Sequence, residues 1–552
     1  MKSSRSKPEK RREQKRWSSF WISSPCQTFL DHLEQPKVII MLVQELSVPL
    51  TIGAAVGVFA AYVVARCIYD LFFHPLRKFP GPKRAAIWSF YEFYYDVIKD
   101  GTYLWEIQKM HEKYGPIIRI NSRSLHIHDP EYFNIIYAGS GRKVNKELSA
   151  VGGYTFPHST ISTLDHDLHR KRRAIVSPYF SKRAIADIEP AIHERIDALI
   201  SRLAEAKGST IDLTCAFSAF TADVVTYHFY GSHANYISSK DFKYGLKDAL
   251  TVLLNLYNLT RFLPIPATTL KSLPLPILGL INQNFPLVVS AREGNKKMVL
   301  NYPNSSDEEK RAMKDARSKS VIVSALTDPS VPDEEKTLDR LLDEGETIIF
   351  AGIDTTARTL SVALFHLLNN KKVLMKLRKE LEAVAKPDGQ QWTTTELEAV
   401  PYMRGVVQEA IRLTYGLVVR IPRISPQEAL QYKGFVIPPG TPVSQSTYLI
   451  NNDSSAFPNP QVFDPERWVK AAQDGVNLDK YMVSFSKGSR ACLGINLAYA
   501  KLYLGIARVA TSLDMDLFET TQKDIDVYHT RGFAFPKEGD GAVKVRITGV
   551  RK

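Results

Sequence analysis

A ten-residue segment near the C-terminus, FSKGSRACLG, has residue types that could hold a metal. It fits the pattern F-x-x-G-x-R-x-C-x-G at every fixed position, namely Phe485, Gly488, Arg490, Cys492 and Gly494. At about five per cent usage for each fixed residue, such a match arises by chance in fewer than about one chain of this length in a thousand. A cysteine thiolate is a metal ligand, whereas the alternative for a single cysteine is an inert buried thiol. The pattern therefore favours ligation of a metal by Cys492.

The other cysteines, Cys26, Cys67 and Cys215, form no C-x-x-C pair and no evenly spaced framework. This argues against structural disulfides and against cysteine-rich zinc sites. We therefore expect the chain to lie on the reducing side of a membrane.

The segment around Cys492 resembles the haem-binding loop of cytochromes P-450, and the resemblance continues in order from Pro80 to the C-terminus. It implies that Cys492 is the axial ligand of haem b and pushes electron density toward bound dioxygen. Gly488 and Gly494 would let the backbone approach the macrocycle and turn tightly into the next helix. Arg490 would reach a haem propionate, and Phe485 belongs to the same loop.

The segment AGIDTT, residues 351–356, lies inside an apolar-periodic stretch that predicts a helix from Thr337 to Asn370. Glycine and a threonine that bonds back to a carbonyl weaken the helical ladder and open a local groove. The resemblance implies that Thr355 bonds the distal oxygen while Asp354 relays protons. Helical spacing places four residues on one face, which we expect to face haem and substrate: Ile348, Ala351, Thr355 and Thr359. Taken alone, the segment could also be ordinary helix sequence.

Glu409 and Arg412 stand three residues apart, on one face of a predicted helix. By itself this spacing is typical of a solvated surface pair that contributes little. The resemblance implies that Arg467, in the segment PERW, joins them in a buried ionic triad. Such a triad would be structural, since breaking one member of a buried set destabilises the fold.

Further site residues follow from the resemblance. Arg173, in HRKRRAIVSPYF, and Arg423, in RIPR, occupy positions of propionate ligands. His169, four residues before Arg173, stands where the family usually has a tryptophan that contacts haem. Three residues are expected to border the substrate pocket: Leu417, Val418 and Val419.

The run from Leu46 to Ala65 carries no charge and is long enough to cross a bilayer as a helix. We assign residues 46–69 to a transmembrane anchor, with a buried core helix as the alternative. The preceding residues, 1–45, are strongly basic, yet basic residues also follow the anchor, and one span cannot keep both ends cytosolic. Met41 as the true start would resolve the conflict. Mass spectrometry that found native peptides from residues 1–40 would exclude this hypothesis.

After the anchor, residues 70–84 form a basic, proline-rich hinge, and residues 85–552 a haem-thiolate catalytic domain. Alternating residues at 117–120 and 124–128 predict a small hairpin, and long helical patterns then continue to about residue 415. Short extended runs at 434–443 and 531–547 predict minor sheets. The predicted class is mainly α with small β-sheets, the cytochrome P-450 fold, preceded by one transmembrane helix.

No G-x-G-x-x-G, Walker A or flavin sequence is present, so a separate electron donor is implied. We expect NADPH–cytochrome P-450 reductase, with cytochrome b5 as a second candidate. The net charge of +14 suits an acidic flavoprotein and anionic lipid, whereas nothing resembles a nucleic-acid recognition module. The apolar, proline-rich run 253–288 is expected to dip into the membrane surface, with an ordinary buried loop as the alternative.

The predicted function is a monooxygenase that hydroxylates or epoxidises a lipophilic small molecule, using dioxygen and NADPH-derived electrons. The chain most resembles filamentous-fungal enzymes of terpenoid and mycotoxin pathways. The expected location is the endoplasmic reticulum membrane, single-pass, with the catalytic domain in the cytosol. Two rivals are a haem-thiolate isomerase or dehydratase and a non-catalytic membrane protein that binds haem or lipid. Both are disfavoured by Asp354 and Thr355, which neither needs.

Overall fold

The computed structural model describes residues 48–139, 141–154, 156–263, 274–281, 283–300, 328–386 and 390–551. The chain divides into two compact units, Met1–His74 and Pro75–Lys552. The N-terminal residues 1–47, with the basic extension and the proposed start at Met41, lie outside the described residues, as do residues 264–273 and 282 of the predicted apolar run 253–288.

In the first unit, helix α3 (Val48–Ile68) continues into a π-helical turn, Tyr69–Phe73. The stretch Gly53–Phe73 is long and apolar enough to cross a membrane, and only 6% of its most apolar window is buried. Helix α19 (Leu338–Asn369) passes the same test, but 72% of its window is buried, as in the core helix of a globular domain. The N-terminal helix is thus a candidate membrane anchor by length, composition and exposure.

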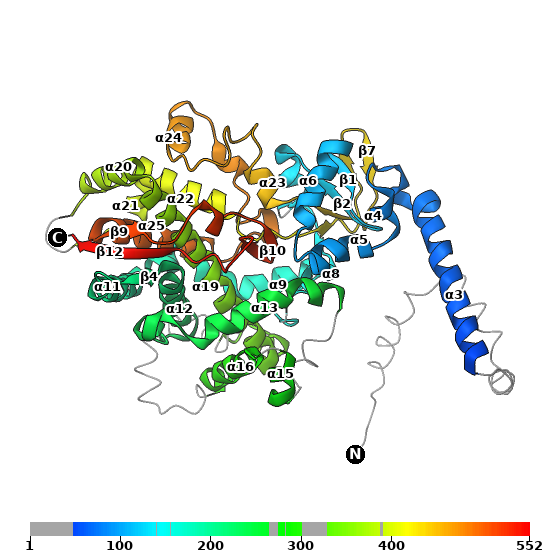
Figure 1. The fold of residues 1–552 in the computed structure, drawn as a ribbon, viewed down its shortest axis with the longest axis horizontal. Helices are drawn as coiled ribbons and strands as arrows, with labels where there is room; N and C mark the ends of the chain where they lie inside the picture. The colour runs from blue at the N-terminus through cyan, green and yellow to red at the C-terminus, as the bar shows by residue number, and fades with distance from the viewer. Residues whose placement is uncertain are drawn as a thin grey trace, which may run out of the picture. The chain divides into compact units, whose positions relative to one another are not determined.

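The second unit is mainly helical (Figure 1). Its α-helices are α4 (Lys83–Ile87), α5 (Phe90–Phe93), α6 (Tyr103–Tyr114), α7 (Phe133–Ile136), α8 (Leu148–Val151), α9 (His166–Val176), α10 (Lys182–Ala186), α11 (Glu189–Glu205), α12 (Leu213–Tyr230), α13 (Gly245–Phe262), α15 (Leu275–Ile281), α16 (Phe285–Leu300), α19, α20 (Lys371–Glu382), α21 (Thr394–Ala399), α22 (Pro401–Thr414), α23 (Thr447–Asn451), α24 (Glu466–Gln473) and α25 (Ile495–Ser512). The helix predicted from Thr337 to Asn370 is confirmed as α19, one residue shorter at each end.

The short strands described in this unit form four small sheets. They are β1 (Ile117–Arg119), β2 (Leu125–Ile127), β3 (Asn145–Lys146), β4 (Thr210–Asp212), β5 (Arg423–Ile424), β6 (Leu430–Tyr432), β7 (Phe435–Ile437), β8 (Pro442–Ser444), β9 (Leu513–Leu517), β10 (His529–Arg531), β11 (Phe533–Phe535) and β12 (Lys544–Val550). The largest sheet has the order β1-β2-β8-β5-β3, and β1 and β2 form the predicted hairpin. Strands β3 and β5 are antiparallel and place Lys146 opposite Arg423.

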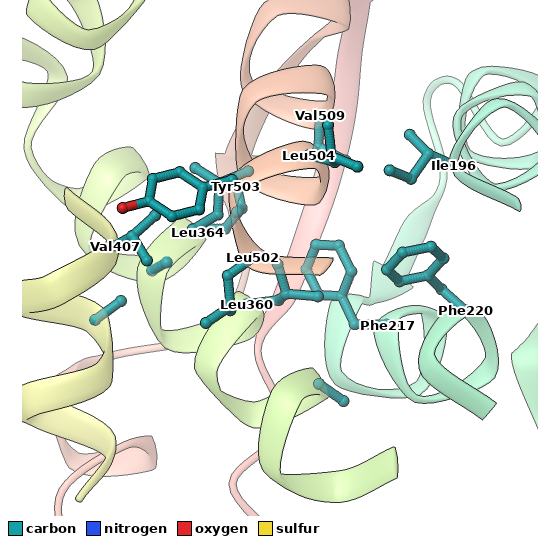
Figure 2. Packing of buried hydrophobic residues seen from close by; sticks show 14 of the residues in the cluster. Ile196, Phe217, Phe220, Leu360, Leu364, Val407, Leu502, Tyr503, Leu504 and Val509 are labelled. Carbon is teal, nitrogen blue, oxygen red and sulfur yellow. The ribbon is translucent and has the colours of Figure 1, made fainter. Parts of the chain in front are cut away.

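The core is built where α25 packs among α19, α11, α12 and α22 (Figure 2). Leu502 and Leu504 of α25 belong to one buried cluster with Leu360 of α19 and Phe217 of α12. Two helices approach closely because one carries glycine at the contact: a Cβ at Gly352 of α19 would come within 2.9 Å of Val225 Cγ2 on α12. Tight apolar packing of this kind stabilises each fully buried large side chain by about 1.5–3 kcal/mol. It fixes α19, which carries the AGIDTT segment, against α25, which follows the cysteine segment.

Candidate functional site

The cysteine segment forms a closed loop before α25. The Cys492 amide donates to the Phe485 carbonyl at 2.9 Å, and Gly494 is the N-cap of the helix. Gly488 has φ +74°, and a Cβ there would lie 2.1 Å from the Ala138 carbonyl oxygen, so no other residue fits. The neighbouring chain at Ala138 is therefore sufficient to require glycine at 488, and the predicted approach to a macrocycle stays a prediction. At Gly494, by contrast, a Cβ would meet nothing within 4 Å, so space is open beside it.

The thiol of Cys492 lies against a hollow inside the protein. Its side chain is exposed, although burial among protein atoms is the largest cause of its raised pKa. The Gly494 amide and the charges of Arg173 and Lys501 oppose this shift and favour the thiolate. On α19, Ala351 is exposed too, while its neighbours Phe350 and Ile353 are buried. Cys492 and Ala351 thus both border space that the chain itself does not fill.

A cavity joins the two predicted motifs. It is bounded by α19, α22, the cysteine loop and α25, through Asp354, Thr355, Thr356, Arg358, Thr359, Ile411, Thr414, Gly416, Ser484, Phe485, Ala498, Leu502 and Phe533. The structure therefore brings Asp354, Thr355 and Thr359 to the same cavity as Phe485. Its wall combines apolar carbon with a few hydroxyl groups, as is typical of small-molecule sites.

The helix α19 is unbroken through the predicted oxygen segment, but its carbonyls carry additional bonds. Thr355 Oγ1 donates to the Ala351 carbonyl at 2.7 Å, as the sequence predicted. Lys501 Nζ donates to the Gly352 carbonyl at 2.7 Å, and Thr221 Oγ1 to the Ile353 carbonyl at 3.0 Å. Side chains thus bond three successive carbonyls of α19 without interrupting the helix.

Asp354 is placed to hold a proton at this cavity. Burial raises the pKa of its carboxyl group, while the charges of Arg358 and Lys247 act in the opposite direction. A carboxyl group with a raised pKa spends more time protonated near neutral pH, which is what proton delivery requires.

Five basic residues gather behind the cysteine loop, and we name them the basic cluster: Lys146, His169, Arg173, Arg423 and Arg490. Four of these side chains bond to carbonyl oxygens: Arg490 donates to the carbonyls of Val144, Thr163, Leu164 and Asp165 at 2.7–3.2 Å, Arg173 to Ala491 at 2.7 Å, Arg423 to Ile421 at 3.1 Å, and Lys146 to Ile161. Arg423 also lies over the ring of Tyr137, 5.1 Å from its centroid.

The charges of the basic cluster repel one another. Burial lowers the pKa of Lys146 well below its ordinary value, and the charges of Arg423, Arg490 and Arg173 lower it further. Burial, followed by repulsion from neighbouring cations, lowers the pKa of His169 to about 2. The same two causes lower the pKa of Arg490 to about 9, although the charge of Asp165 opposes this shift. Buried cations are normally paired with anions. The cluster is therefore suited to a ligand that carries two negative charges.

Lys146 was not found by sequence reasoning. It lies on β3 beside Arg423 only because β3 and β5 pair, and its segment, KVNKEL, shows no motif. No feature of the sequence alone would have separated it from a surface lysine.

The triad predicted from the resemblance is assembled, and with Trp468 it forms what we call the Glu409 cluster. Arg412 donates two bonds to the Glu409 carboxylate, at 2.7 and 3.0 Å, and Arg467 Nε donates at 3.0 Å. Trp468 Nε1 adds a bond of 2.8 Å, and the Asp464 amide one of 3.0 Å. The side chains of Glu409 and Arg412 are 0% exposed. Every acceptor of the carboxylate is thus satisfied by the chain itself.

The residues predicted to border one substrate pocket lie in different places in the structure. Thr359 lines the cavity with Thr355, and Ala351 is exposed. Val418 and Val419 line a separate small cavity beside Arg261 and Arg420. Ile348 is buried, and the Leu417 carbonyl accepts a bond of 2.6 Å from Thr447. The structure does not bring Val418 and Val419 to the cavity of the oxygen segment.

A reachable cysteine in a helix-leading loop, a basic cluster behind it and a threonine cavity on α19 define a haem-thiolate protein. The sequence matches the cytochrome P450 family over residues 80–541. It is 88% identical over 512 residues to Cytochrome P450 monooxygenase pbrB of Penicillium brasilianum and to Cytochrome P450 monooxygenase astB of Aspergillus terreus, covering 93% of this chain and 100% of each relative. It is 45% identical to Cytochrome P450 monooxygenase TRI4 of Trichoderma arundinaceum, covering 91% of this chain and 97% of that one.

Among solved structures, retinoic acid bound cyanobacterial CYP120A1 aligns with a TM-score of 0.62 at 19% identity, covering 80% of this chain and 93% of that one. At this identity the alignment shows the fold alone. The chain belongs to the cytochrome P450 family. It is a haem-thiolate monooxygenase, which uses haem, dioxygen and electrons from a reductase.

The residues present fit the haem that the family implies. The basic cluster offers several donors and no carboxylate of its own to two propionates, and Cys492 opens onto interior space. A Cβ at Gly494 would meet nothing within 4 Å, and Ala351 of α19 is exposed, so neither position is filled by the chain itself.

Proposed function

We propose that Cys492 ligates the iron of haem b, and that the enzyme hydroxylates or epoxidises a terpenoid or other lipophilic fungal secondary metabolite. The observation that carries the proposal is the basic cluster beside a reachable cysteine, because among the described residues its side chains bond to carbonyl oxygens and form no salt bridge with a carboxylate. The fungal sources of the similar proteins, among them Conidiogenone synthase PchP450 of Penicillium rubens at 42% identity, support the substrate class. Bound haem supplies oxygen activation and insertion, which protein side chains cannot perform.

The chain's own residues would hold and orient this group. Arg490, Arg173 and Arg423 would share their guanidinium donors between the two propionates, and Lys146 would add an ammonium group. His169 is neutral at physiological pH and would donate one N–H to the same region. Phe485, Gly488 and Gly494 would shape the loop so that the thiol is presented to the hollow.

Proton movement would run through α19. Asp354 would hold a proton because burial raises the pKa of its carboxyl group, and Thr355 in the same cavity would pass it on from Oγ1. Thr355 Oγ1 donates its one hydrogen to the Ala351 carbonyl, so the hydroxyl would have to turn away from that carbonyl to pass this hydrogen on while its oxygen accepts another. The pair favours oxygen insertion over isomerisation or dehydration, which need no proton relay.

The remaining arrangement is proposed on the charge and hydropathy of the sequence. Residues 46–69 anchor the chain in the endoplasmic reticulum membrane, residues 70–84 form the hinge, and residues 85–552 form the catalytic domain in the cytosol. NADPH–cytochrome P-450 reductase supplies the electrons, with cytochrome b5 as a second donor, and the net charge of +14 suits acidic partners.

The first test is the reduced carbon monoxide difference spectrum of the wild type and of Cys492→Ser. A strongly red-shifted Soret band in the wild type that is absent from the variant supports thiolate ligation. The matched control is Cys215→Ser, a buried cysteine on α12 that should keep the band. A wild type without haem, or a Cys492→Ser protein with an unchanged band, would refute the proposal. Product analysis in a host that makes candidate terpenes then tests the substrate class.

A further inference from the structure

Arg358 is a cation at the cavity to which the proposed function gives no role. It lies on α19 just after the AGIDTT segment and lines the cavity together with Thr355, Thr359 and Phe533. Its guanidinium group lies over the ring of Phe535, with Cζ 5.8 Å from the ring centroid. In a cavity with a mostly apolar wall, the few polar and charged groups fix the orientation of a bound molecule.

The guanidinium group of Arg358 forms no hydrogen bond and no ion pair with any residue in the described parts of the chain. Arg340, a buried arginine of the same helix, differs in this respect, because it donates to Glu335 at 2.8 Å and also to Glu344. Arginine is rarely buried without a partner, and its N–H donors match the two oxygens of a carboxylate. Arg358 therefore has donors available for a ligand.

Two carboxyl groups act on Arg358 from beyond ion-pair distance. Burial lowers the pKa of Arg358, and the charges of Asp354 and Asp540 oppose this shift. Asp354 stands four residues earlier on α19, but burial raises the pKa of its carboxyl group and so favours its neutral form. Asp540 is exposed, so water competes for its charge. Neither group takes the place of an anion bound to the guanidinium group.

The surroundings of Arg358 leave room for its guanidinium group. A Cβ at Gly541 would lie 3.0 Å from Nη1 of Arg358, so a larger residue at this position would press on the group. On α19 the arginine is placed by a helix whose neighbours Ala357 and Leu360 are fully buried. A guanidinium group that lies over an aromatic ring, as here over Phe535, keeps the N–H groups at its edge free to donate.

We propose that Arg358 binds a carboxylate of the lipophilic substrate and so selects, within the proposed substrate class, molecules that carry an acid group. This inference rests on the proposed function, because it takes the cavity as the place where the substrate binds. The guanidinium group would donate two N–H bonds to the carboxylate, while Phe533 and the apolar wall contact the hydrocarbon part. A neutral molecule would leave the guanidinium group without a partner, which disfavours its binding.

The test uses the full-length holoenzyme and two probes of the same length, dodecanoic acid and methyl dodecanoate. Calorimetry measures the Kd of each at a pH at which the acid is ionised. Arg358→Met removes the charge and the donors, whereas Arg358→Gln removes the charge and keeps an amide donor. The matched control is Arg546→Met, which removes the same charge from an exposed position on β12.

We expect the wild type and Arg546→Met to bind the acid about tenfold more tightly than the ester, as is typical of hydrogen bonds to a charged group. Arg358→Met should lose this preference through weaker binding of the acid alone, and Arg358→Gln should lose most of it. A wild type without the preference, or Arg358 variants that keep it, would overturn the inference. Loss of folded protein in both Arg358 variants would also overturn it, because it would assign the arginine to the stability of the fold.

These outcomes are distinct from a failure of the proposed function. A wild type that lacks the red-shifted carbon monoxide band would refute thiolate ligation by Cys492. Calorimetry does not depend on that band, so the preference for the acid is measured in either case.

Discussion

The basic cluster and the Glu409 cluster are both largely buried and both rich in arginine, yet their charges are balanced differently. In the Glu409 cluster, two arginines and a tryptophan satisfy one carboxylate with bonds of 2.7–3.0 Å. In the basic cluster, the hydrogen bonds of three arginines and a lysine go to carbonyl oxygens, and neighbouring positive charges lower the pKa values of Lys146 and Arg490. Buried cations that are paired with carboxylates of the chain can stabilise the fold. Buried cations without such a carboxylate indicate a missing anionic ligand.

In a third group of buried charges, carboxylates of the chain pair with the cations. Glu92 and Asp96 meet Arg261 and Arg420, with Arg261 at 2.8 Å from Glu92 and 3.0 Å from Asp96, and Arg420 at 2.9 Å from Asp96. Two carboxylates face two guanidinium groups from α13 and from the segment after α22. We name this the Glu92 cluster, and we expect it, like the Glu409 cluster, to act in stability and not in ligand binding.

The largest expected effect comes from breaking the Glu409 cluster. Glu409→Ala leaves Arg412 and Arg467 buried without their anion, which should lower the free energy of unfolding by about 3–5 kcal/mol. The loss should occur with and without haem, because the cluster needs no ligand. Denaturant titration of both forms measures it. Glu466→Ala, in an exposed pair with Lys376, is the control and should change stability by less than about 0.5 kcal/mol. Equal effects of the two substitutions would contradict the distinction.

The second prediction concerns pH and the Glu92 cluster. Burial alone raises the pKa of Glu92, but the charges of Arg420 and Arg261 outweigh it and lower the pKa to about 2. The folded pKa is below the unfolded value of 4.5, so the stabilisation is complete above that pH and is lost as the pH falls toward 2. We expect about 2–3 kcal/mol to disappear over this range. Glu92→Gln should flatten the pH dependence of unfolding below pH 5, and an unchanged slope would show that other groups control acid denaturation.

The sequence predicted those parts of the site that lie in contiguous motifs. The cysteine loop, the AGIDTT segment and the three charged residues of the Glu409 cluster have fixed spacings, and the structure brings them together. The sequence alone could not reveal Lys146 and Lys501, because their burial depends on segments far away in the chain. Lys501, for example, bonds to Gly352, 149 residues earlier. Nor could it explain Gly488, whose need for glycine comes from the carbonyl of Ala138. Val418 and Val419 were placed by analogy, and side-chain packing decides which cavity they line.

The smallest effect, and the sharpest test of the comparison, is expected from Lys146→Met. In the haem-free chain the pKa of Lys146 lies well below 10.5, so folding favours the neutral amine, and at neutral pH this residue lowers stability. Its removal should raise the free energy of unfolding of the haem-free protein by up to about 1 kcal/mol, since repulsion is relieved. The same variant should bind haem about tenfold more weakly, a loss of about 1.4 kcal/mol.

A higher free energy of unfolding without haem, together with weaker haem binding, would distinguish Lys146 from every member of the Glu409 cluster. Lys372→Met, at an exposed position on α20, is the control and should change neither quantity. Haem-free protein is obtained by expression under haem limitation, and its stability is compared with that of the reconstituted enzyme. If Lys146→Met destabilises both forms equally, Lys146 stabilises the fold without a ligand. That result would contradict the assignment of the basic cluster as a propionate site.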